Sequence, residues 1–85
     1  MNIKVLGSGC MNCITLEKRT AEAIKIMGIE AEIEKVTDFQ QIASYGILRT
    51  PGIVIDEKVV IQGRVPTVEQ IQEIIKQEII KKEII

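Results

Sequence analysis

The hydrophobic pattern changes its period close to the N-terminus, and this change constrains the fold more than any other feature of the chain. Residues 2–6 (NIKVL) form a short apolar run that indicates a β-strand. Gly7-Ser8-Gly9 interrupts the run, and from Met11 onward apolar residues recur at helical spacing among charged ones. Gly28 is well placed to end this helix in the left-handed conformation. The chain therefore begins with a strand that leads through a glycine-containing turn into a long helix.

A second strand and a short helix are expected next. Residues 29–36 (IEAEIEKV) alternate apolar and acidic side chains, which indicates a strand with one wet face, at or near the edge of a sheet. The following segment predicts a helix with a capping box, in which Thr37 or Asp38 pairs with a glutamine three residues later. Gly46 is expected to end this helix.

A hairpin and a last helix complete the pattern. The apolar runs 52–55 (GIVI) and 58–61 (KVVI) predict a β-hairpin, although the intervening Asp56-Glu57 turn lacks the usual glycine. A second capping box, formed by Thr67 and Gln70, begins a C-terminal helix that is expected to extend over about residues 67–85. One narrow stripe of this helix would pack on the sheet: Val68, Ile71, Ile75 and Ile79.

The predicted order of elements is β-α-β-α-β-β-α. This order indicates an α/β fold, a three-layer α/β/α sandwich with a four-stranded mixed sheet. The length of 85 residues suits one domain, over residues 1–85, because a chain of this size can fold around a single core.

Composition narrows the classes of function. Eleven basic and twelve acidic residues give a net charge of −1, so nothing indicates a nucleic-acid or a polybasic membrane partner. Histidine is absent, which removes imidazole-based catalysis and imidazole metal sites. The sequence shows neither a signal-peptide pattern nor a membrane-spanning apolar run, so we expect a cytoplasmic protein. In that compartment a close cysteine pair is more often catalytic or metal-binding than a permanent cross-link.

The only two cysteines lie in the segment GSGCMNC, where the first strand leads into the first helix. Cys10 is placed at or just before the helix N-terminus, where free backbone N–H groups and the helix dipole stabilise a thiolate. The pKa of such a thiol falls from about 8.5 towards 7 or lower. Cys13 follows one turn later on the same face and can close a disulfide with Cys10. This arrangement suits thiol–disulfide exchange, with Cys10 as nucleophile and Cys13 as resolving thiol.

A strand, a C-x-x-C motif and a helix in this order resemble the thioredoxin superfamily. The sequence is most similar to the small archaeal and bacterial group called redox-active disulfide proteins, which lack the first strand and helix of ordinary thioredoxin. Thr50-Pro51 stands where the superfamily places a cis-proline beside its disulfide, and Gly63 where it places a glycine that faces the substrate. The resemblance covers about residues 2–76.

The resemblance implies a thioredoxin-like fold and a protein-disulfide oxidoreductase that acts as an electron carrier, needing no organic cofactor or metal. Its expected partners are disulfide-containing proteins and an upstream disulfide reductase. The catalytic residues would be Cys10 and Cys13, and the residues that contact substrate would be Met11, Asn12, Thr50, Pro51 and Gly63.

Four positions depart from the thioredoxin pattern. Gly9 replaces the tryptophan before the first cysteine, and Met11-Asn12 replaces Gly-Pro between the pair. The buried acid that assists the second cysteine of thioredoxins is replaced by Lys4.

Other interpretations of the motifs remain at this point. Copper-chaperone domains also place C-x-x-C between a first strand and helix, and soft thiolates suit Cu(I), but those domains have the order β-α-β-β-α-β. A structural zinc site is a further alternative, but it would need more ligands than two thiolates. In the last alternative, the two cysteines have no chemical role and are simply small apolar residues. Thr50-Pro51 has the alternative of an ordinary trans peptide bond. We expect a monomer, with a weak dimer through Ile80, Ile84 and Ile85 as the alternative.

Overall fold

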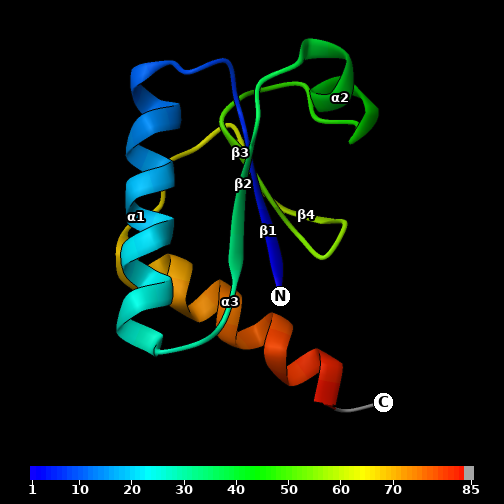
Figure 1. The fold of residues 1–85 in the computed structure, drawn as a ribbon. Coiled ribbons are helices and arrows are strands. Elements are labelled where there is room, and N and C mark those ends of the chain that lie inside the picture. The colour runs from blue at the N-terminus through cyan, green and yellow to red at the C-terminus, as the bar shows by residue number, and fades with distance from the viewer. Residues whose placement is uncertain (84–85) are drawn as a thin grey trace.

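The computed structural model describes residues 1–83, and its elements follow the predicted order β-α-β-α-β-β-α (Figure 1). The sheet has four strands in the order β2-β1-β3-β4, with β1 and β2 parallel and the other pairs antiparallel. The mixed four-stranded sheet is therefore confirmed. The bounds are β1 Asn2–Leu6, α1 Met11–Met27, β2 Glu32–Val36, α2 Phe39–Ser44, β3 Gly52–Ile55, β4 Lys58–Gln62 and α3 Val68–Glu83.

Helices α1 and α3 cover one face of the sheet and α2 covers the other, which confirms the three-layer α/β/α sandwich (Figure 1). Strand β3 is buried along its whole length because it is central in the sheet and has helices on both sides. The larger core cluster, under α1 and α3, contains Ile3, Leu16, Ala23, Ile53, Ile55, Ile61, Ile71 and Ile75. The smaller cluster, under α2, contains Leu6, Val36, Ile42, Ile47 and Val54.

Strand β2 is shorter than the alternation of residues 29–36 predicts, because it begins only at Glu32. Its parallel partner β1 starts at Asn2, which pairs with Glu32, so no strand lies beside residues 29–31. The prediction that this strand lies at a sheet edge is confirmed.

The β3–β4 hairpin turns through Asp56 and Glu57, both with positive φ angles of 46° and 69°. Two hydrogen bonds to Asn2 hold this turn: the Asp56 N–H donates to the Asn2 carbonyl at 2.8 Å, and the Asn2 N–H donates to Asp56 Oδ1 at 2.9 Å. The predicted hairpin is confirmed, and these contacts explain how it forms without a glycine in the left-handed positions.

The helix ends agree with the sequence at three of four predicted places. Gly28 ends α1 with a φ of 65°, and Gly46 follows α2 with a φ of 76°. The Thr67–Gln70 capping box forms in both directions, through bonds of 2.9 and 3.1 Å. The capping box predicted for α2 is wrong, because Asp38 precedes that helix without a side-chain hydrogen bond to it. The exposed Asp38 carboxylate is left to water at the start of a helix only six residues long.

The predicted stripe of α3 packs as expected: Ile71 and Ile75 are each only 1% exposed, and Val68 and Ile79 pack against the same cluster. Of the residues predicted for a weak dimer, Ile80 is 36% exposed, whereas Ile84 and Ile85 lie outside the described residues. None of the helices found in residues 1–83 is long and apolar enough to cross a membrane.

Replacement of Ile75 by alanine should lower the free energy of unfolding by about 2–5 kcal/mol, because it opens a cavity between α3 and the sheet. Urea unfolding followed by circular dichroism measures the change. Ile26→Ala is the matched control, since Ile26 is 58% exposed and its loss should change stability by only about 0.5 kcal/mol or less. Equal losses for the two variants would contradict this description of the core.

Candidate active site

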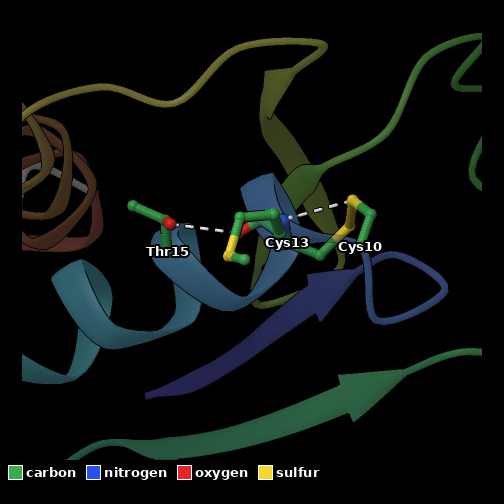
Figure 2. The surroundings of a disulfide bond; sticks show 4 residues. Cys10, Cys13 and Thr15 are labelled. Carbon is green, nitrogen blue, oxygen red and sulfur yellow. Dashed lines mark hydrogen bonds between the residues drawn. A yellow bond between two sulfur atoms is a disulfide. The ribbon is translucent and has the colours of Figure 1, made fainter.

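Cys10 and Cys13 form a disulfide at the start of α1, with their Cα atoms 5.0 Å apart (Figure 2). The two sulfurs differ in their surroundings. Cys10 is exposed at the surface, whereas Cys13 is 5% exposed and belongs to the buried face of α1. Cys10 is therefore accessible to an incoming molecule, whereas Cys13 is not.

The local backbone explains why the first sulfur meets the helix terminus. Cys10 is the N-cap residue of α1, with extended φ and ψ angles of −65° and 166°, and its carbonyl accepts the first helical bond from Ile14. Its Sγ accepts a hydrogen bond of 3.2 Å from the backbone N–H of Cys13 (Figure 2). The first turn holds no acidic side chain that would oppose a thiolate. The positive end of the helix dipole is thus directed at Cys10 Sγ.

Gly7 lies directly against the Sγ atom of Cys13. A methyl group built on Gly7 would overlap Cys13 Sγ and would lie only 3.0 Å from Cys13 Cβ. The N–H of Gly7 donates to the Val36 carbonyl at 3.0 Å, so the backbone there is also tied to the end of β2. Only a residue without a side chain allows the strand end to approach Cys13 this closely.

The second half of the site comes from the start of β3 and the end of β4. Leu6 pairs with Gly52, and Gly52 pairs with Gln62. The segments around Pro51 and Gly63 therefore lie at the end of the sheet where β1 leads into the disulfide loop. The Thr50–Pro51 peptide bond is cis, as the resemblance implied, and the trans alternative is wrong. Pro51 is buried, while Thr50 is exposed.

Gly63 is bound to this cis-proline segment. Its N–H donates to the Pro51 carbonyl at 2.8 Å, and its φ of 72° is a conformation that favours glycine. A Cβ atom at Gly63 would lie 2.9 Å from the Cβ of Arg49, so the absence of a side chain also lets the arginine stem cross it. The structure therefore brings Thr50, Pro51 and Gly63 together.

Lys4 replaces the buried acid of thioredoxins in the sequence, but its side chain does not point towards Cys13. It lies between Ile3 and Val5 on β1 and so points to the opposite face of the sheet from α1. There its Nζ donates to Glu57 Oε1 at 2.6 Å and to the Tyr45 hydroxyl at 2.8 Å. These bonds raise the pKa of Lys4, and the one from Lys4 lowers the pKa of Glu57. Because the pKa of Glu57 is lower in the folded protein than its ordinary value of 4.5, the ionised carboxylate stabilises the fold above pH 4.5. This stabilisation is lost as the pH falls through the lowered pKa.

Exposed side chains lie beside the accessible sulfur in the first turn of α1. Met11 and Ile14 are 76% and 42% exposed. Asn12, between the two cysteines, is also exposed. The predicted contact residues Met11 and Asn12 thus lie at the surface beside Cys10, together with Ile14. Near the cis-proline segment, Leu48, three residues before Pro51, is 95% exposed.

Comparison with known proteins assigns the family. A family model described as a thioredoxin domain matches residues 1–76. The chain belongs to the thioredoxin family. A thioredoxin of Methanothermobacter thermautotrophicus is 43% identical over 75 residues, which cover 88% of this chain and 97% of the relative. A thioredoxin of Methanocaldococcus jannaschii is 39% identical over 74 residues, which cover 87% and 85%.

Family membership and the C-x-x-C disulfide together give the activity. The protein is a thiol–disulfide oxidoreductase that acts on disulfide substrates and is itself reduced by a reductase. The thioredoxin-like interpretation of the sequence is confirmed. The copper-chaperone alternative required the order β-α-β-β-α-β, whereas the described elements follow the order β-α-β-α-β-β-α.

Gly7 and Ile14 adjoin the cysteines, but the sequence analysis does not predict them as site residues. Gly7 is predicted only as part of the turn after the first strand, although its place three residues before the first cysteine is a usable signal. The exposure of Ile14 follows from its position in the first turn of α1. Leu48, before the cis-proline segment, gives no signal, because an apolar residue in a loop does not reveal its exposure.

Gly7→Ala should lower the free energy of unfolding of the oxidised protein by about 1–3 kcal/mol, since the added methyl group forces Cys13 or the strand end to move. Urea unfolding with the disulfide intact measures this change. Ser8→Ala, at the exposed neighbouring position, is the control and should have little effect. A Gly7→Ala protein as stable as the control would show that the contact with Cys13 does not constrain the site.

Proposed function

We propose that Cys10 is the attacking thiolate and Cys13 the resolving thiol of this oxidoreductase, acting on disulfides in cytoplasmic proteins. The supporting observation is the asymmetry of the pair. Cys10 is exposed and lies at the helix N-terminus, where backbone N–H groups stabilise a negative sulfur. Cys13 is buried against Gly7 and is out of reach of a protein substrate.

The exchange proceeds in two displacements. The Cys10 thiolate attacks one sulfur of the substrate disulfide, a mixed disulfide forms, and the other substrate sulfur leaves as a thiolate that takes up a proton. Cys13 then loses its proton and attacks Cys10 Sγ, which releases the second substrate sulfur. Two electrons have passed to the substrate, and the protein holds the Cys10–Cys13 disulfide until a reductase returns it to the dithiol.

The cis-proline segment would hold the substrate during these steps. Thr50 is exposed and lies two residues before the first residue of β3, so its backbone N–H and C=O are positioned to bind an extended segment lying across Cys10. Gly63 is bonded to Pro51 and carries no side chain, so the stem of Arg49 can lie against it beside this segment. Met11, Asn12, Ile14 and Leu48 would contact the same segment, and the three apolar ones lose exposed surface when they do so.

Resolution requires no partner subunit, because both sulfurs come from one chain. We therefore propose that the protein acts as a monomer, with the reductase as its only obligatory redox partner.

Trapping the mixed disulfide tests the assignment of roles. The Cys13→Ser protein should accumulate a covalent complex with a disulfide substrate such as insulin, because Cys10 can attack and nothing resolves the product. The Cys10→Ser protein is the matched control and should form far less complex, since the remaining thiol is buried. Intact-mass spectrometry after quenching with acid measures both. Equal trapping by the two variants, or trapping only by Cys10→Ser, would contradict the assignment.

A further inference from the structure

Two arginines lie beside the cis-proline segment, and neither is used by the chemistry described above. Arg49 immediately precedes Thr50, and Arg64 immediately follows Gly63. Both are exposed. The aliphatic stem of Arg49 crosses Gly63, since a Cβ built there would lie 2.9 Å from Arg49 Cβ and 3.1 Å from Arg49 Cδ. The two positive charges therefore come from adjacent segments on one side of the substrate surface.

The segments that carry these arginines are held in place. The Gly63 N–H bonds to the Pro51 carbonyl at 2.8 Å. On the other side of Arg64, the guanidinium of Arg19 on α1 donates to the carbonyls of Val65 and Pro66 at 3.5 and 3.1 Å. Arg19 thus directs its donors to the backbone and fixes the segment after β4, while Arg64 projects from that segment at the surface.

Within the described residues, Arg49 and Arg64 form no ion pair, because the pairs found there join Lys4, Lys35, Lys58, Lys81 and Lys82 to carboxylates. Other exposed cations, such as Lys25 and Lys76, are also absent from these pairs. The two arginines are distinguished by their position on adjacent segments beside Thr50-Pro51. An arginine fork is suited to carboxylates, which it can bind through two parallel hydrogen bonds.

We propose that Arg49 and Arg64 select polypeptide substrates that carry acidic residues next to the cysteine that Cys10 attacks. The inference rests on the proposed function, because it places the substrate segment across Thr50-Pro51, between the two arginines and Cys10. Carboxylates flanking the target cysteine then lie within reach of both guanidinium groups. Attraction of this kind raises the rate of encounter and fixes the orientation of the bound segment.

The exposure of the arginines favours a polypeptide over a small anionic disulfide. Arg49 and Arg64 are both exposed, and Leu48, the residue before Arg49, is 95% exposed. An open surface of this kind suits a chain that lies across it.

Two synthetic peptides test the proposal. Each is cyclised by one disulfide, and they differ only in carrying glutamate or glutamine on both sides of one cysteine. Stopped-flow measurement at low ionic strength gives the rate constant for oxidation of the reduced protein by each peptide. Each ratio of rate constants, glutamate over glutamine, is divided by the same ratio measured with dithiothreitol, because the charges also alter the reactivity of the peptide. We expect a corrected ratio of about five for the wild-type protein, which falls as salt is added.

Charge variants locate the effect. Arg49→Gln/Arg64→Gln keeps long side chains and should bring the corrected ratio to about one, and Arg49→Glu/Arg64→Glu should invert it. Lys25→Gln/Lys76→Gln removes the same charge from exposed positions on α1 and α3 and should leave the ratio unchanged. A wild-type ratio near one, or a preference that survives in the arginine variants, would overturn this inference alone. Failure of the wild-type protein to reduce either peptide would overturn the proposed function as well.

Discussion

The start of α1 is the constraint on which the rest of the site depends. Because Cys10 caps the helix, its sulfur receives the N–H of Cys13 and the positive end of the dipole while it remains in contact with water. The same helix places Cys13 one turn later on the buried face. One geometric fact therefore closes the disulfide and also places its two sulfurs in different surroundings. Gly7 completes the arrangement, since the buried sulfur needs a strand end without a side chain beside it.

The sheet positions the other half of the site by register alone. Three residues are successive neighbours across β1, β3 and β4: Leu6, Gly52 and Gln62. The adjoining segments, with Pro51 and Gly63, therefore meet at the same end of the sheet although they are far apart in sequence. The bond from Gly63 to Pro51 joins the two segments directly. The proposed substrate surface is thus positioned by the register of β1, β3 and β4. The charged contacts of Lys4 with Glu57 and Tyr45 hold the opposite face of the sheet, away from the chemistry.

Features that depend on local pattern could be predicted from the sequence, whereas features that depend on tertiary contact mostly could not. The switch of hydrophobic period indicated every element in order, and Thr67–Gln70 indicated a cap that forms. The analogous cap at Asp38 does not form, because a preference for capping does not ensure it on a short, exposed helix. β2 begins at Glu32, later than the alternation of residues 29–36 predicts, because its partner β1 begins at Asn2. The alternation within residues 29–36 carries no information about where β1 begins. The cis bond at Thr50–Pro51 was predicted from family resemblance alone, since a local Thr-Pro pair fits either isomer. The juxtaposition of Arg49 with Gly63 depends on the packing of distant segments and leaves no local signal, whereas the contact of Gly7 with Cys13 is indicated only by the place of Gly7 three residues before Cys10.

The pH dependence of alkylation of the reduced protein tests the central claim most directly. Iodoacetamide reacts with thiolates, so the rate of modification of each cysteine, followed by mass spectrometry of the digested protein, reports its ionisation. The helix terminus should make Cys10 react first and with a midpoint clearly below the value of about 8.5 for free cysteine. Cys13 should react slowly at every pH below that value because it is buried. A midpoint for Cys10 equal to that of free cysteine, or faster reaction of Cys13, would contradict the account.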